Sequence, residues 1–312
     1  MSIPIVLPTS LENLLTHYKE FCSTKGLHFS TIRNYETCCR MFLSSLHNIG
    51  VSDSKDITAT AISKACLQLS NSSDFPRIRT FLKFLFAVGY LAMDYSSVIP
   101  RFKRPQPMPS IYSVQEVQQI EEKADGDTPF RKRNYAMLLL ATRLGIRSGD
   151  IVTMTFDELD FQSETIRIIQ NKTGTPVELP MPPSVRNALV DYIQNYRGDS
   201  TSRYVFLSLE PPFSAITVTA FGRYMRLALK DAGIEPGHRK SGPHSMRSSL
   251  ASSMINDNIS YETVRRTLGH TGANTIKNYA KLDVEQLKLY TLEPPEASGH
   301  FAEVLSGRYL VK

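Results

Sequence analysis

A proline-rich basic segment divides this 312-residue chain and limits the folds open to it. Residues 99–109 read IPRFKRPQPMP, with four prolines and three basic residues. Because proline fixes the backbone and lacks an amide hydrogen, such a segment favours a stiff, extended linker over a helix or a strand. The chain length is also typical of about two domains. We therefore predict a first domain over residues 1–99, a linker over 100–110, and a second domain that begins at residue 111.

The first part of the chain has the apolar spacing of four amphipathic helices. Apolar residues recur three and four positions apart, and Ser10 and Ser30 stand where serine side chains can cap a first turn. The predicted helices lie between residues 10 and 26, 30 and 50, 58 and 69, and 76 and 89. Short loops between amphipathic helices are typical of a small bundle. By itself, such a bundle suits an oligomerisation or regulatory domain.

The second part of the chain mixes helical and strand patterns. A capping box from Ser113 to Glu116 opens one helix. Residues 165–168 alternate as a strand does, residues 171–174 form a turn, and residues 175–179 return as a second strand. Other patterns predict helices over 130–144, 183–196 and 217–232, and a short strand over 204–207. The whole chain is therefore predicted to be mainly α-helical with a small β-sheet, an α+β fold.

Charge and cysteine usage narrow the class of protein. The net charge is +6, and residues 1–104 hold 12 Lys and Arg against 7 Asp and Glu, so the surplus lies mainly in the first part. This excess is compatible with a nucleic-acid partner without requiring one. Cys22, Cys38, Cys39 and Cys66 lack CxxC spacing, which argues against a zinc site. Cys22, Cys39 and Cys66 fall near apolar helical positions, which favours buried free thiols. With no signal peptide and no apolar run of about 18–20 residues, we expect a cytoplasmic, reduced protein.

Residues 243–282 combine side chains that suit chemistry on a phosphodiester. They contain His244, Arg247, His270 and Tyr279. Each is ordinary alone, because a helical tyrosine usually packs in a core and a His-x-x-Arg pair usually faces solvent. Together they supply a nucleophile and several donors. A phenol can attack phosphorus and be held as a phosphotyrosine, while guanidinium and imidazole groups stabilise the charge that the non-bridging oxygens gain.

This arrangement resembles the C-terminal signature of the tyrosine recombinases, the phage-integrase and Xer-type family. Two more family motifs occur upstream, in the same order. The run ATRLGIRSGDI resembles the first arginine box and supplies Arg147 and the acidic Asp150, while NKTG resembles the hairpin turn that carries the family lysine, here Lys172. The similarity covers most of residues 111–290. It implies a four-helix core-binding (SAM-like) domain, followed by a catalytic domain with a three-stranded antiparallel sheet.

The resemblance also implies a role for each residue of the site. Tyr279 attacks phosphorus and leaves a 3′-phosphotyrosyl bond, and Lys172 protonates the leaving 5′-oxygen. His244 takes the tyrosine proton or orients its neighbours, and Asp150 accepts a hydrogen bond from an arginine or from His244. The donors that hold the scissile phosphate are Arg147, Arg247 and His270. No metal and no cofactor is implied, since arginine supplies the positive charge.

Double-stranded DNA with paired inverted half-sites is the implied partner. The family resemblance favours a homo-tetramer on DNA, a protein that can be monomeric in solution, and a Holliday-junction intermediate. Residues 291–312 are expected to dock on a neighbouring protomer, with docking on their own domain as the alternative. The basic candidates for phosphate contact are Arg101, Lys103, Arg104, Arg239 and Lys240. We further expect a prokaryotic, nucleoid-associated protein of a mobile element.

Three functions are open to this sequence. The first is a site-specific recombinase or integrase that needs neither ATP nor metal. The second is a catalytically inactive relative that binds DNA for architecture or regulation. The third is a relaxing topoisomerase, which fits the site but fits the separate helical domain less well. The complete set of six catalytic side chains favours the first, because a protein that only binds DNA has no physical need of the nucleophile.

Overall fold

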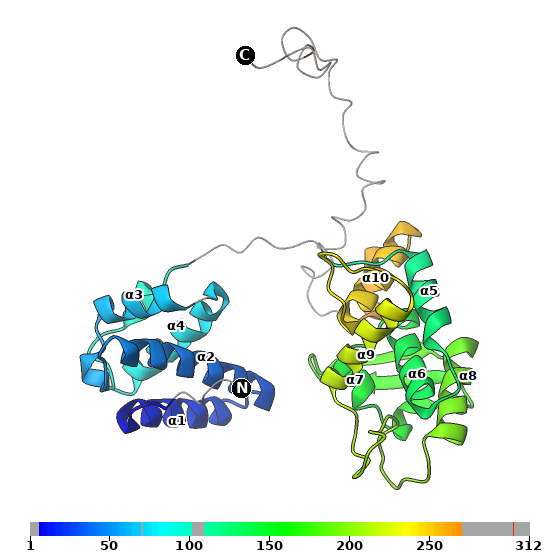
Figure 1. Ribbon diagram of the computed structural model, residues 1–312, viewed down its shortest axis with the longest axis horizontal. Coiled ribbons are helices and arrows are strands. Elements are labelled where there is room, and N and C mark those ends of the chain that lie inside the picture. Colours follow the sequence, from blue (N-terminus) through cyan, green and yellow to red (C-terminus); the bar gives the residue numbers. More distant parts are fainter. Residues whose placement is uncertain (1–5, 70, 102–108, 270–301, 303–312) are drawn as a thin grey trace. The chain divides into compact units, whose positions relative to one another are not determined.

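The computed structural model describes residues 6–69, 71–101, 109–269 and 302 (Figure 1). The chain forms two compact units, unit 1 (Met1–Gln106) and unit 2 (Pro107–Lys312). The division falls within the segment predicted as a linker, most of which lies outside the described residues. Within the described part of the chain, no helix has the length and apolar character needed to cross a membrane.

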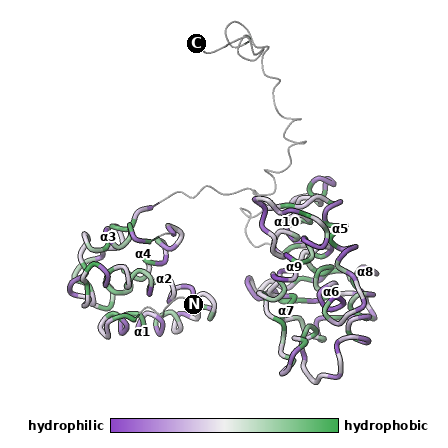
Figure 2. The backbone as a smooth tube through the Cα atoms, viewed as in Figure 1, coloured by the Kyte–Doolittle hydropathy of each residue, from purple (hydrophilic) through white to green (hydrophobic). Residues whose placement is uncertain are grey.

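Unit 1 is a small helical bundle in its described part. Its helices are α1 (Thr9–Thr24), α2 (Phe29–Asn48), α3 (Ala59–Gln68) and α4 (Phe75–Ala87). Three 3-10 turns connect or follow them: η1 (Ser54–Asp56), η2 (Ser72–Asp74) and η3 (Tyr95–Val98). All four predicted helices are present, because hydrophobic and polar stretches alternate along each of them (Figure 2) and the hydrophobic face packs inward.

Two predicted helix caps are wrong. Helix α1 starts after Pro8 without a side-chain cap, and the Ser10 hydroxyl instead donates to Asp53 at 2.7 Å. Helix α2 starts one residue before Ser30, and it is His28 whose ring nitrogen accepts from the Ser30 amide at 3.3 Å. In the first case a distant carboxylate competes for the hydroxyl, and this competition cannot be read from local spacing.

The core of unit 1 is built from aromatic and aliphatic side chains of α1, α2 and α4. Tyr18 contacts Phe81 and Phe84 with ring centroids 4.9 and 5.2 Å apart, and Phe42 and Phe81 are fully buried. The four cysteines are all free and buried: Cys22, Cys38, Cys39 and Cys66. The prediction of buried free thiols is therefore confirmed.

Unit 2 surrounds one buried helix with further helices and a sheet. Its helices are α5 (Val114–Ala124), α6 (Pro129–Arg143), α7 (Ser148–Val152), α8 (Pro183–Asp191), α9 (Val218–Asp231), α10 (Pro243–Asn256) and α11 (Tyr261–Thr267). The π-turn Tyr192–Tyr196 continues α8, and a 3-10 turn, η4 (Phe156–Glu158), precedes the sheet. Along α6 the side chains from 136 to 141 are buried on every side. A helix with this pattern belongs in a core.

The sheet has three antiparallel strands in the order β1 (Leu159–Asp160), β2 (Thr165–Ile169) and β3 (Pro176–Pro180). Ile166 and Ile168 face the core, and Arg167 between them faces outward opposite Glu178. The three-stranded sheet was expected, but residues 204–207 do not supply a strand. Tyr204 and Leu207 form isolated bridges to two different segments, at Thr155 and Ala215. A run whose two ends pair with different partners cannot form a regular ladder.

Candidate active site

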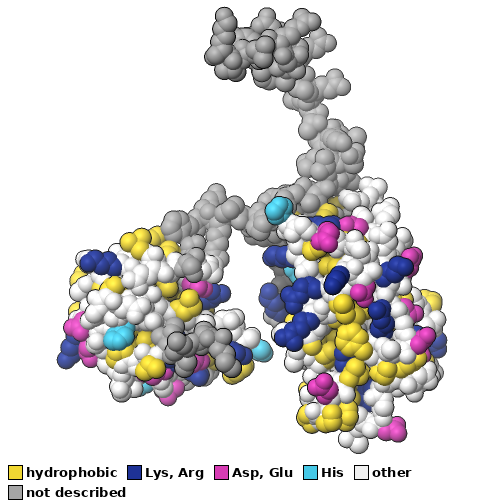
Figure 3. All heavy atoms as spheres, in the orientation of Figure 1, with side chains coloured by type: hydrophobic (Ala, Val, Ile, Leu, Met, Phe, Trp, Pro, Cys, Tyr) yellow, Lys and Arg dark blue, Asp and Glu magenta, His cyan; other side chains and the backbone are white. Residues whose placement is uncertain are grey.

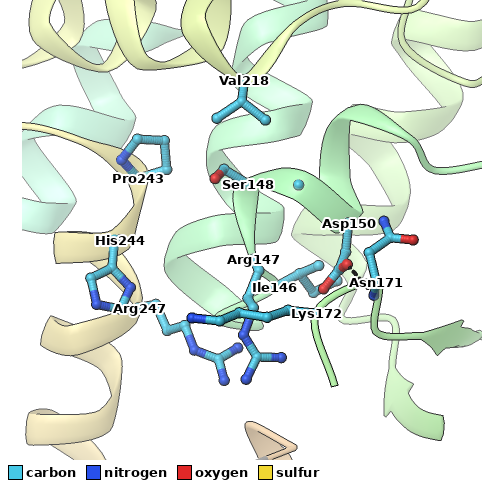
Figure 4. A pocket seen from close by; sticks show the side chains of 11 residues that line it. Ile146, Arg147, Ser148, Asp150, Asn171, Lys172, Val218, Pro243, His244 and Arg247 are labelled. Atoms are coloured by element: carbon cyan, nitrogen blue, oxygen red, sulfur yellow. Dashed lines mark hydrogen bonds between the residues drawn. The ribbon is translucent and has the colours of Figure 1, made fainter. Parts of the chain in front are cut away.

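A pocket of about 390 Å³ opens where the start of α7, the β2–β3 turn and the start of α10 meet (Figure 4). It is lined by Ile146, Arg147, Ser148, Gly149, Asp150, Asn171, Lys172, Val218, Pro243, His244 and Arg247. Five residues that the sequence singled out for chemistry thus lie together, although three separate segments supply them. His270 and Tyr279 lie outside the described residues. Among those that are described, no group of three or more His, Cys, Asp or Glu side chains could hold a metal ion.

The turn after α6 presents Arg147 to the pocket. Helix α6 ends at Arg143, and Gly145 adopts a left-handed conformation with φ +62°. A β-carbon on Gly145 would lie 2.6 Å from Leu268 Cδ2, so this position needs glycine both for its conformation and for its contact. The chain then enters α7 with Arg147 at the N-cap position. The position of the buried helix α6 thereby determines where the backbone of Arg147 lies.

Arg247 is the more deeply held of the two arginines. It lies on α10 with 2% of its surface exposed and donates to Gly145 O at 2.6 Å and to Leu268 O. Arg147 donates to the next carbonyl, Gly269 O, at 3.4 Å. Both guanidinium groups therefore bond to the same short backbone segment, directly before His270. This places two permanent positive charges beside one pocket.

Lys172 and His244 face the arginines from opposite sides. Lys172 is exposed on the β2–β3 turn, and in Figure 4 its side chain extends across the two guanidinium groups toward His244. His244, in the first turn of α10, is accessible at the pocket. Nevertheless the surrounding protein displaces enough water to lower the pKa of His244, and the charges of Arg247, Lys240 and Lys172 lower it further. A neutral imidazole can accept a proton.

The Asp150 carboxylate accepts a hydrogen bond from the β2–β3 turn that carries Lys172, and not from an arginine. Its side chain is 5% exposed, and one carboxylate oxygen accepts the Asn171 amide at 2.9 Å. The other oxygen has no hydrogen-bond partner among the described residues. Burial raises the pKa of Asp150, although Arg147 and Arg247 act in the opposite direction. We expected a bond to an arginine or to His244; since α7 faces the β2–β3 turn, the carboxylate meets that turn first.

The comparison with known proteins decides the family. Residues 112–286, more than half of the chain, match the family described as "Phage integrase family". The chain belongs to the phage integrase family. It is accordingly a tyrosine site-specific recombinase by class.

Relatives of this integrase-family chain align along most of its length. It is 29% identical over 300 residues to a putative integrase/recombinase, y4rA, of Sinorhizobium fredii, covering 92% of this chain and 72% of the relative. It is 24% identical over 296 residues to the tyrosine recombinase XerC of Vibrio parahaemolyticus, covering 90% and 92%. The crystal structure of the recombinase XerH bound to a palindromic difH substrate, a post-cleavage complex, shares the fold with a TM-score of 0.69 at 17% identity, covering 88% of this chain and 83% of that one.

The predicted DNA contacts fall into different environments in this integrase-family structure. Lys240 is exposed, and Arg101 is exposed at the last described position of unit 1. Lys103 and Arg104 lie outside the described residues. Figure 3 shows further Lys and Arg side chains gathered along the edge of unit 2 where α7 and α9 lie. Arg239 differs, because it stacks 4.2 Å over the Tyr112 ring and forms a two-pronged ion pair with Glu116.

Sequence reasoning missed one residue of this site, Gln170. It directly follows the last residue of β2, lies two positions before Lys172, and is 2% exposed. A glutamine has no reactive group, and no spacing rule marks it. Its importance follows only from its partners in the fold.

Proposed function

We propose that this integrase-family chain cuts and rejoins DNA strands through a 3′-phosphotyrosyl bond to Tyr279. The convergence of Arg147, Arg247, Lys172 and His244 on one pocket carries the proposal. A phosphodiester shares one negative charge between two non-bridging oxygens, which gain further charge in the transition state, and two fixed guanidinium groups can donate to both oxygens. The order of these residues along the chain is that of the family.

In the cleavage step, the Tyr279 oxygen forms a bond to phosphorus while the bond from phosphorus to the 5′-oxygen breaks. The tyrosine proton passes to neutral His244, and the leaving oxygen takes a proton from Lys172. Arg147 and Arg247, with His270 as a further donor, stabilise the charge that develops on the non-bridging oxygens. Asp150 keeps the Lys172 turn in place. The phosphotyrosine conserves the bond energy, so a second 5′-hydroxyl can attack it without ATP.

The proposed partner is double-stranded DNA with paired inverted half-sites, bound by four copies that pass through a Holliday junction. Two findings support this proposal: membership of the phage integrase family, and the likeness of fold to the XerH complex with palindromic DNA. Two separate units, each with basic residues, would allow one copy to contact a half-site at more than one place.

Replacing Tyr279 with phenylalanine tests the chemistry. This change removes the attacking oxygen and keeps the ring. On a nicked half-site that traps the intermediate, we expect the wild type to form a covalent adduct and Tyr279→Phe to form none, with half-site affinity unchanged. Adduct formation by Tyr279→Phe would move the nucleophile to another tyrosine, with Tyr261 and Tyr290 the first to examine. Absence of adduct from the wild type would support the inactive DNA-binding alternative.

The tail is proposed to act between protomers. Phe301, Val304 and Leu305 have helical spacing in a segment too short to be stable alone. Deleting residues 293–312 should therefore leave binding to a single half-site intact and reduce both cooperative binding to a full site and recombination, measured by gel shift and by product formation. Unchanged cooperativity in the truncated protein would assign the tail to its own catalytic unit.

A further inference from the structure

Gln170 is a buried amide at the junction of three parts of the site. It is 2% exposed and is not one of the residues that line the pocket, so it lies behind them. Its main chain closes the lysine turn: the Gln170 amide donates to Thr175 O at 3.0 Å, and the Gln170 carbonyl accepts from the Gly174 amide at 2.8 Å. Lys172 lies inside this closed turn.

The side chain of Gln170 connects that turn to both arginines. Its Oε1 accepts from Arg147 Nη1 and from the Thr173 hydroxyl, the latter at 3.0 Å. Its Nε2 donates to Leu268 O at 3.1 Å, the carbonyl that also accepts from Arg247. A carboxamide suits this place because one end accepts and the other donates. The two functions lie at fixed ends, so the partners determine the orientation of the amide.

The neighbouring backbone is shaped to fit this amide. Gly269 has φ +59°, and a β-carbon there would lie 2.5 Å from Gln170 Nε2. The absence of a side chain at Gly269 therefore allows the strand end and the segment leading to His270 to approach closely. Three separated segments, at Arg147, at Lys172 and at Leu268–Gly269, thus meet on one side chain.

We propose that Gln170 is a positioning residue that fixes the Arg147 guanidinium and ties the Lys172 turn to it. The inference rests on the proposed function and adds a residue to it. A long arginine side chain has many rotamers, and an acceptor that selects one of them prepares the site before the phosphate arrives. The acceptor is neutral, which leaves the charge of Arg147 for the phosphate. A carboxylate at the same place would pair with Arg147 and weaken the stabilisation that this arginine gives to the charge of the transition state.

Two substitutions and a matched control test this role. Gln170→Ala removes the acceptor, and Gln170→Glu keeps an acceptor but adds a negative charge. Gln119→Ala is the control, because Gln119 is exposed on α5 away from the pocket. The maximal rate of adduct formation on the nicked half-site and the half-saturating DNA concentration are measured separately. Rates are expressed per DNA-binding-competent molecule, which corrects for any unfolded fraction.

We expect both Gln170 variants to lose roughly 10- to 100-fold in maximal rate, as misplaced catalytic groups do, with half-saturation within about twofold of the wild type. Gln119→Ala should match the wild type in both quantities. A purely structural role would lower the competent fraction and leave the rate per competent molecule unchanged. Either Gln170 variant reacting at the wild-type rate per competent molecule overturns the proposal. A wild type that forms no adduct would instead refute the proposed function.

Discussion

At the scale of single residues, the site is governed by an excess of positive charge around its pocket. Arg147, Arg247 and Lys172 all act on His244, and each makes its protonated form less favourable. The carboxylate that lines the pocket, Asp150, is turned toward the Asn171 amide. The surroundings therefore keep the imidazole neutral, as a proton acceptor must be.

The pH profile of cleavage tests this account. The pKa of His244 lies below its ordinary value of 6.5. We expect adduct formation to hold its rate as the pH falls to 6.5 and to decline only below it, as His244 takes a proton. Since the unfolded chain is protonated first, stability should also fall with pH below 6.5. His244→Asn should remove the acidic decline at a much lower overall rate. A decline centred above 6.5 in the wild type would contradict the lowered pKa.

At this scale, the sequence predicts those residues whose side-chain chemistry and order along the chain indicate a role. Arg147, Lys172, His244 and Arg247 are found because their chemistry and order carry a signal within the chain itself. Gln170 is not, because its partner Leu268 is 98 residues away and glutamine carries no reactive group. The partner of Asp150 was mistaken for the same reason, since three segments meet there and their relative placement is a property of the fold.

At the scale of elements, hydrogen bonds join the segment that leads into α5 to helix α10 and to the loop before it. The Tyr112 amide donates to Ser249 at 2.7 Å, and the Lys240 amide donates to Ser110 at 2.9 Å. Arg239 completes the fastening, with hydrogen bonds to Glu116 and to the carbonyls of residues 111, 235 and 236. These bonds engage all five N–H donors of the guanidinium. They fix the start of α10, where His244 and Arg247 lie.

Arg239 and Lys240 should therefore behave differently, although sequence suggested a phosphate contact for both. Arg239→Ala should cost about 1–3 kcal/mol of stability, because it leaves Glu116 without its charged partner, and should leave the salt dependence of DNA binding unchanged. Lys240→Ala should keep the thermal midpoint and reduce the slope of log affinity against log salt by about 1. Thermal unfolding and salt titrations measure the two effects. A reduced slope with full stability in Arg239→Ala would restore Arg239 as a phosphate contact.

Helices were easier to predict than their boundaries and partners. The apolar period places α1, α2, α5 and α6, and the capping box at Ser113 is present in full. The predicted Ser10 cap is wrong because the Ser10 hydroxyl donates a hydrogen bond to Asp53, 43 residues away. The strand predicted over residues 204–207 is absent because strand pairing depends on partners that lie elsewhere in the chain.

At the scale of the whole molecule, each unit has a core of its own. The core of unit 1 is drawn from residues 7–99, and the main core of unit 2 from residues 112–246. In the described part of unit 2, α10 and α11 share a second small cluster, formed by Ala251, Ile255, Val264 and Leu268. A segment with its own core is expected to fold alone. The charge is divided unevenly, with a net +5 over residues 1–104, from 12 basic and 7 acidic residues.

Separating the units should therefore preserve folding and weaken DNA binding. We expect fragments 1–101 and 109–312 each to unfold in one cooperative transition. The fragment 109–312 should bind a half-site more weakly than the full chain, and its affinity should depend less steeply on salt, because each lost phosphate contact removes about 0.9 from the slope. A variant of the full chain with Lys64→Ala, an exposed change of one charge, is the control for non-specific charge loss. If 109–312 binds with the affinity and salt slope of the full chain, unit 1 does not contact DNA, and its bundle is an oligomerisation or regulatory domain.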